Sequence, residues 1–138
     1  MASNILPVVW NENNQVKWVG IRPGYTGDHL TADGLVANGV VDIYTVPANK
    51  ILLLFNSEVA LAVNGAGAFY AFLNIYNAVP AIIHICNRVI GAGATATGQS
   101  NVVRFVPYPL PAGYKIELSC IGVPTYGAAD IEGILVDA

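Results

Sequence analysis

Apolar residues recur in short runs from Val40 to the C-terminus, and each run is bounded by glycine, proline or asparagine. Runs of this length that are rich in valine, isoleucine, tyrosine and phenylalanine are typical of β-strands. The pattern predicts seven strands, near residues 40–46, 50–63, 68–76, 81–90, 101–106, 114–121 and 130–136. Seven short strands at fairly even spacing, without a helical period, predict an all-β protein that folds as a single jelly-roll-like antiparallel β-sandwich.

Two of the predicted strands carry apolar residues on both faces. Every residue from 51 to 55 is apolar, and in 68–76 one set of aromatic residues alternates with a second apolar set. Strands that are covered on both sides have this pattern. We therefore expect the contact between subunits on these strands, at Leu52, Leu54, Tyr70, Phe72 and Tyr76.

Residues 1–37 differ from the rest of the chain. They hold both tryptophans among asparagine, glycine, proline and aspartate, with little periodicity. This predicts an extended arm with one short hairpin, residues 7–10 against 15–21, followed by a sandwich domain over 38–138. Ordering each backbone residue costs about 1–2 kcal/mol, and a tryptophan offers a large area to bury, so we expect the arm to pack on a neighbouring molecule. The expected partner contacts are Trp10, Trp18, Ile21, Arg22 and Tyr25.

The composition is unusually apolar for one domain. Hydrophobic residues make up 54% of the 138 residues and charged residues only 11%, against about 25% charged in an average domain. A membrane-spanning helix needs about 20 consecutive apolar residues, which the chain lacks, and its start does not resemble a signal peptide. We therefore expect no membrane insertion and a homo-oligomer whose interfaces cover the apolar surface. The alternative is a monomer with an unusually apolar core.

The charge of the chain argues against one class of partner, and its two cysteines can be assigned an expected state. The formal net charge is −3, and the six basic residues are scattered singly. Nucleic-acid binding needs a clustered basic surface, so we expect none. Cys86 and Cys120 lie in apolar contexts that are typical of buried free thiols, with a disulfide as the alternative.

The candidates for catalysis and metal binding are sparse. His84 and Cys86 alternate on one strand as a conceivable nucleophile pair, but residues two apart on a strand are about 6–7 Å apart at Cα. Asp130 and Glu132 resemble paired acids only in spacing, without a surrounding cleft. The segment with Asp28, His29 and Asp33 has too few carboxylates for a calcium loop. The glycine-rich residues 91–100 lack the lysine of a phosphate loop and are expected to connect two strands. We expect no enzyme activity, no cofactor and no metal.

Two turn-and-strand couplets carry a resemblance to a known group of proteins. Residues 41–61, VDIYTVPANKILLLFNSEVAL, and residues 110–119, LPAGYKIELS, each place a tight turn before a strand. Pro47 and Pro111 fix φ in these turns, while Asn49 and Gly113 are suited to positive φ. From Val40 onward the chain resembles the small trimeric β-sandwich proteins of tailed bacteriophages, which include capsid decoration (cement) proteins, head fibres and tail-fibre tips.

The resemblance implies a structural role on a virion. It implies a homotrimer on the capsid surface, made in the host cytoplasm, which binds and stabilises the shell of the major capsid protein through an extended arm. The chain has no repeat or heptad, which favours a compact decoration protein over a fibre shaft. The alternative is the tip of a head or tail fibre that binds a host receptor or glycan through loops 64–68 and 123–127 around Tyr126.

Overall fold

The described part of the protein consists of β-strands and the turns that connect them. The computed structural model describes residues 9–12, 15–18, 27–64, 67–79, 81–92, 95–122 and 125–138. The strands are β1 (Val9–Glu12), β2 (Gln15–Trp18), β3 (Asp28–Ala37), β4 (Gly39–Thr45), β5 (Lys50–Asn64), β6 (Ala68–Tyr76), β7 (Ile82–Ala92), β8 (Thr95–Leu110), β9 (Lys115–Ile121) and β10 (Thr125–Asp137). The described residues include no helix with the length and apolar character needed to cross a membrane.

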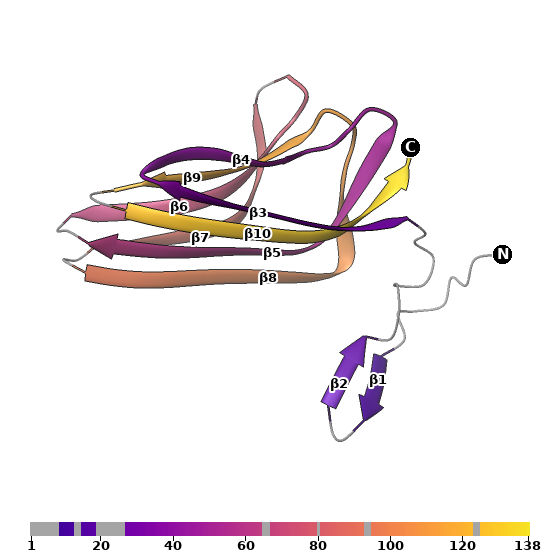
Figure 1. Ribbon diagram of the computed structural model, residues 1–138, viewed down its shortest axis with the longest axis horizontal. Coiled ribbons are helices and arrows are strands. Elements are labelled where there is room, and N and C mark those ends of the chain that lie inside the picture. The colour runs from indigo at the N-terminus through magenta and orange to yellow at the C-terminus, as the bar shows by residue number, and fades with distance from the viewer. Residues whose placement is uncertain are drawn as a thin grey trace.

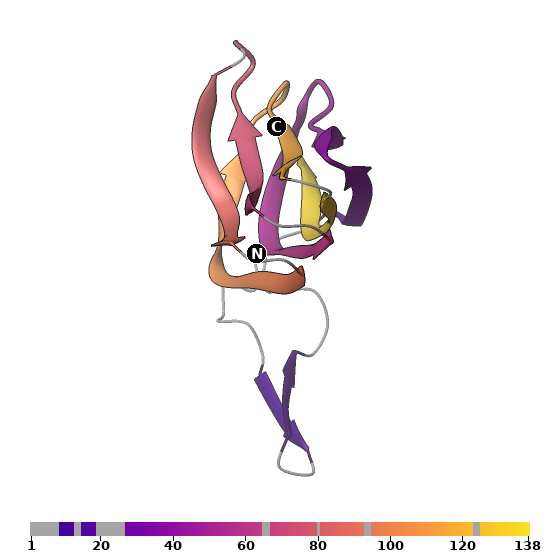
Figure 2. The same ribbon diagram turned by 90° about the vertical axis from the view of Figure 1, so that its left-hand side faces the viewer.

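Strands β3 to β10 form two antiparallel sheets of four strands each, in the orders β3-β10-β5-β8 and β4-β9-β6-β7. Consecutive strands lie in opposite sheets, except β6 and β7, which form a hairpin within one sheet. Figure 1 shows the strands of the first sheet stacked from β3 to β8, and Figure 2 shows the same layers after a 90° turn. Eight strands in two packed sheets with crossing connections are a jelly roll, so the predicted fold class is confirmed.

The core lies between the two sheets and is built from alternate residues of each strand. In β6 the inward residues Phe69, Ala71, Leu73 and Ile75 are at most 4% exposed. Removing a large apolar side chain from water stabilises the fold by roughly 1.5–3 kcal/mol. The period of two in the sequence therefore sets which side of each strand faces the opposite sheet.

All seven predicted strands are present, and the predicted turn conformations are confirmed at two positions. Asn49 has φ 61° and Gly113 has φ 82°, both in the left-handed region. The Gly113 amide donates to the Val46 carbonyl (2.9 Å), and the Val46 amide donates to the Tyr114 carbonyl (2.9 Å). The two turns of the sequence couplets therefore lie against each other at one end of the sandwich.

Strand β8 is longer than predicted. Its first residues, which the sequence analysis assigned to a connection, pair with β5 from Thr95 onward. The residues there are small or polar, so they lack the alternation of apolar and polar side chains that predicts a strand. Between Val103, opposite Asn56, and Tyr108, opposite Leu54, four residues of β8 face a single residue of β5. This bulge precedes Pro109 on the edge of the sheet, where a proline costs no ladder hydrogen bond.

The arm is shorter than predicted, and the boundary at residue 37 is wrong. Residues Asp28–Ala37 form β3, an edge strand that pairs with β10 from Asp28↔Leu135 to Ala37↔Tyr126. The sequence does not predict this strand, because small residues such as Ala32 and Gly34 occupy its inward positions. A side chain at position 34 would collide with Ile43. The sandwich therefore begins at Asp28.

The predicted hairpin near the N-terminus is present with shifted ends. Strands β1 and β2 pair antiparallel from Val9↔Trp18 to Glu12↔Gln15 and form a separate two-stranded sheet. In Figure 1 this hairpin stands apart from the eight strands of the sandwich.

Candidate interaction surfaces

The outward side of sheet β4-β9-β6-β7 carries exposed apolar residues in adjacent cross-strand positions. Ile121, Tyr70 and Ile90 lie side by side across β9, β6 and β7. Ile90 is 62% exposed and Ile121 42%. The rings of Tyr70 and Phe72 are 5.2 Å apart between centroids. We call this set the apolar face: Val40, Tyr70, Phe72, Tyr76, Ile82, Ile85, Ile90 and Ile121.

The other half of the same sheet side carries paired charges. The Lys115 ammonium lies 3.0 Å from the Asp42 carboxylate and 2.8 Å from the Glu117 carboxylate. Its nitrogen also lies 5.2 Å from the centre of the Tyr76 ring. The hydrogen bonds that Lys115 donates to the carboxylates of Glu117 and Asp42 raise the pKa of Lys115, so it stays cationic at neutral pH. On this half the Lys115 ammonium is thus paired with two carboxylates. On the apolar half the exposed Arg88 lies opposite Phe72, and the surrounding isoleucines Ile85, Ile90 and Ile121 stay exposed.

The residues predicted to form the subunit interface fall into two groups in the structure. Tyr70, Phe72 and Tyr76 lie on the apolar face, which agrees with an outward position. Leu52 and Leu54 are 0% exposed in the single chain, because they face the opposite sheet in the core. Their assignment to a subunit contact is therefore corrected. A strand with apolar residues on both sides does not reveal from sequence which side faces inward.

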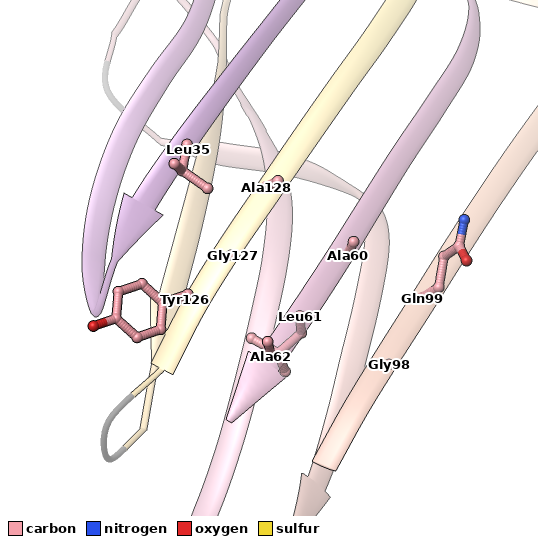
Figure 3. Close-up of a pocket in the computed structure, with 9 residues that line it drawn as sticks. All are labelled: Leu35, Ala60, Leu61, Ala62, Gly98, Gln99, Tyr126, Gly127 and Ala128. Carbon is pink, nitrogen blue, oxygen red and sulfur yellow. The ribbon is translucent and has the colours of Figure 1, made fainter. Parts of the chain in front are cut away.

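A hollow lies on the outward side of the other sheet. Leu35, Ala128, Ala60 and Gln99 form one cross-strand row over β3, β10, β5 and β8. Figure 3 shows Leu35 and Tyr126 on one side and Gln99 on the other, with three alanines and the buried Leu61 between them. The hollow has a volume of about 580 Å³. We use the name hollow for Leu35, Ala60, Ala62, Gly98, Gln99, Tyr126 and Ala128.

An acidic row borders the hollow. Asp33, Asp130 and Glu58 are directly opposite one another on β3, β10 and β5. Glu58 accepts hydrogen bonds from the side chains of Gln99 and Asn101. None of the ion pairs within the described ranges involves these three carboxylates. Burial, and then the charges of Glu58, Asp33 and Glu132, raise the pKa of Asp130. The row is therefore a concentration of negative charge without a cation of the described chain beside it.

The other acidic and histidine candidates lie on an open sheet surface. His29 and Asp33 are on the outward side of β3, and the His29 imidazole lies 3.4 Å from the Glu132 carboxylate. Asp130 and Glu132 share the outward side of β10. Over the described part of the chain, no group of three histidine, cysteine, aspartate or glutamate side chains is arranged to hold a metal ion.

The pair His84 and Cys86 lies where β7 approaches β8. The His84 ring stacks on Tyr108 with 4.9 Å between centroids. Burial raises the pKa of Cys86 to about 11, partly opposed by the Arg104 charge. Because the thiolate is the nucleophilic form, a thiol with this pKa is inert at neutral pH. Cys86 and Cys120 are both buried and free, as the sequence predicted.

A polar link joins the two sheets next to Cys86. Asn87 is 2% exposed, and its side-chain amide donates to the backbone carbonyls of Ser57 (3.0 Å) and Ser100 (3.1 Å). The Arg104 guanidinium donates to the Ser57 hydroxyl at 3.1 Å. Buried polar groups that are hydrogen-bonded in this way fix the register between layers. The cluster therefore has a structural role.

The predicted partner-contact residues fall in the N-terminal part of the chain. Trp10 lies in β1 and Trp18 in β2, and the structure describes their backbone only. Ile21, Arg22 and Tyr25 lie outside the described residues.

The hollow and five of the eight residues of the apolar face were not predicted from the sequence. The members of the hollow come from four strands that are distant in sequence, and most of them are alanine or glycine, which carry no local signal. For Ile82, Ile85 and Ile90 a signal exists, because they are large apolar residues on a strand that also has inward apolar residues. The pairing of β7 with β6 places them on the side of the sheet that faces away from the core, which leaves them exposed.

No model of a protein family matches the chain, and no curated protein sequence matches it. A Bacillus endospore appendage, from a family of disulfide-linked pili, superposes with a TM-score of 0.36 and 15% identity over 79% of this chain and 87% of the other. A structure of infectious bursal disease virus, strain Gx, superposes with a TM-score of 0.39 and 11% identity over 96% of this chain. The chain spans 37% of that viral protein. Both TM-scores are below 0.5, so neither similarity bears on function.

Proposed function

We propose that this chain is a structural subunit of a multi-copy assembly, a capsid decoration protein that forms a homotrimer and stabilises a shell of major capsid protein. The apolar face is the observation that carries the self-association. Monomeric soluble proteins rarely expose large contiguous apolar patches, and obligate interfaces are apolar. A second copy that covers Ile90, Ile121 and Tyr70 removes this surface from water at about 25 cal/mol per Å².

The virion part of the proposal has a separate basis. Jelly rolls occur in viral capsid domains, lectin domains and cupins, so the fold alone does not choose among these roles. The resemblance of residues 41–61 and 110–119 to phage decoration proteins supports the capsid role. The N-terminal segment with Trp10, Trp18, Ile21, Arg22 and Tyr25 is then the contact with a capsid or a neighbouring subunit.

Self-association is tested by replacing one residue of the apolar face. Ile90→Glu places a charge on the face at the end of the row Ile121, Tyr70 and Ile90, on the edge strand β7, where it leaves the core intact. Light scattering is expected to give three times the chain mass for the natural chain and a single chain mass for Ile90→Glu. Val79→Glu is the matched control, because Val79 is 76% exposed outside the face. A natural chain that remains a single chain at about 100 μM contradicts the proposal.

The capsid role is tested on particles of the virus that encodes the chain. Electron microscopy of particles made with and without the chain is expected to show an added surface density only when the chain is present. Particles made with a chain that lacks residues 1–26 are expected to show this density at much lower occupancy. Normal occupancy without the segment contradicts its role as the contact, and the same density in particles without the chain contradicts decoration.

A further inference from the structure

The hollow combines an apolar floor with room for large side chains. The outward residues of two neighbouring strands are small here, namely Ala60, Ala62 and Ala128. Their methyl groups leave a shallow depression in the surface of the sheet. Leu35 is 73% exposed and Tyr126 is 54% exposed at the rim. The two rim side chains stand beside an empty volume that no other side chain of the described residues fills (Figure 3).

The acidic row extends this surface at one end. A second, smaller hollow of about 360 Å³ includes Asp33, Glu58 and Asp130 and shares Leu35, Ala60 and Ala128 with the first. The continuous surface therefore changes from apolar to acidic along the strands. An occupant that matches it presents large apolar side chains next to basic ones.

The N-terminal segment of the chain has this chemistry. Residues 1–26 contain both tryptophans, with Lys17 and Arg22 against a single acid, Glu12, a net charge of +1. Residues 27–138 contain four basic and eight acidic residues, a net charge of −4, which together with the segment gives the formal −3 of the chain. The segment and the sandwich are thus opposite in charge, and Lys17 directly precedes Trp18.

We infer that the hollow and the acidic row bind the N-terminal segment, residues 1–26, of a second copy of this chain. The apolar floor receives a tryptophan, and the acidic row receives Lys17 or Arg22. This inference rests on the self-association in the proposed function, and it names the neighbouring copy as the partner of the segment.

The position at which the N-terminal segment joins the sandwich favours binding to the hollow of a second copy over binding to the hollow of its own chain. Gly27 packs against the end of β10, where a Cβ on it would lie 2.3 Å from the Leu135 carbonyl oxygen. Ala128, in the hollow, is seven residues back along β10, roughly 23 Å at 3.3 Å per residue. The nine residue steps from Trp18 to Gly27 span at most about 30 Å. For Trp18 to reach the hollow of its own chain, the segment would have to reverse at Gly27 and span about three quarters of its greatest length, whereas a neighbouring copy approaches without this constraint.

The tryptophans provide the test, because both lie in the segment and their emission reports on it alone. With the full-length chain, emission is expected to shift to shorter wavelength as concentration rises and the segment is buried by a second copy. Ala60→Arg fills the hollow and opposes the basic residues, so it is expected to abolish the shift. Ala48→Arg, in an exposed turn, is the matched control and is expected to retain it.

A second variant separates binding from folding. Asp130→Asn removes one charge from the acidic row, where the neighbouring carboxylates repel it, so the fold is expected to be at least as stable. The concentration needed for half of the emission shift is expected to rise several-fold. Asp28→Asn, outside the row, is the control.

Sedimentation of the same samples distinguishes the outcomes. Self-association that persists in Ala60→Arg while the emission shift is lost supports the inference. Self-association with an emission shift that Ala60→Arg and Asp130→Asn leave unchanged overturns it and leaves the proposed function standing. Emission that is already shifted at all concentrations and is sensitive to Ala60→Arg assigns the hollow to the same chain's segment, which also overturns it. A chain that stays monomeric throughout overturns both.

Discussion

Burial determines the chemistry of the two cysteines in this protein more than charge does. Cys86 lies beside Arg104, whose charge favours a thiolate, yet burial outweighs that charge and raises the pKa of the thiol to about 11. Burial likewise raises the pKa of Cys120. The two thiols therefore behave as small apolar side chains in the core, which is the usual state of a free cysteine.

The stability of the fold is expected to fall in alkaline solution because of Cys86. Its pKa rises from 9.0 to about 11, so the folded chain keeps a proton that the unfolded chain releases between these values. The free energy of unfolding is unaffected by this group below about pH 9 and falls as pH approaches 11, by at most about 1.4 kcal/mol per pH unit. Urea unfolding at about pH 8 and about pH 10.5 measures the loss.

Cys86→Ala provides the comparison for this pH dependence. The variant is expected to lose less stability between the two pH values than the natural chain. Some loss remains, because burial also raises the pKa values of Cys120 and Tyr76. An identical loss in both proteins would show that burial of Cys86 is not the cause.

At the scale of elements, β3 is the strand that separates the N-terminal segment from the sandwich. It is an edge strand with alternating exposure, and Leu30, Ala32 and Val36 pack against the core. Its partner β10 pairs with β3 on one side and β5 on the other. Loss of β3 would leave β10 as an open edge with its backbone groups unpaired, which favours aggregation.

Two truncations test where the folded domain begins. A chain that starts at Gly27 is expected to keep cooperative thermal unfolding, followed by circular dichroism, because every strand of the two sheets is retained. A chain that starts at Asn38 lacks β3 and is expected to lose cooperative unfolding or to aggregate, since total stabilities of domains are only about 5–15 kcal/mol. Cooperative unfolding of the shorter chain would show that the folded domain begins after residue 37, as the sequence predicted.

At the scale of the whole molecule, the topology joins residues that are far apart in sequence. Strand β10 pairs with β3 and β5, and β9 pairs with β4 and β6, while within the two four-stranded sheets only β6 and β7 are neighbours in both sequence and sheet. Each long-range pairing requires a large loop to close before its contacts stabilise the structure.

Refolding is therefore expected to be slow for a chain of this length. Stopped-flow dilution from urea, followed by tyrosine fluorescence, is expected to give a main phase of milliseconds to seconds, as in other sandwiches dominated by non-local pairing. A main phase in microseconds would contradict the predicted role of the topology.

Most of the strands were predictable, and the reason is local. Val40, Ile116 and their neighbours alternate or cluster between glycine and proline residues, so each strand has its signal within a few positions. Strand β3 and the start of β8 escaped prediction because alanine and glycine occupy their alternating positions. Of the predicted surface residues, Tyr70, Phe72 and Tyr76 lie outward, while Leu52 and Leu54 lie in the core.

The sequence by itself determined the all-β class, the turns at Asn49 and Gly113, the buried free cysteines and the excess of apolar residues. These properties depend on residue type and on neighbours a few positions away. Only the tertiary structure decided which side of β5 faces inward, which isoleucines remain exposed and which small residues form the hollow. The physical reason is that covering one strand face requires a partner from a distant part of the chain, and no local pattern specifies that partner.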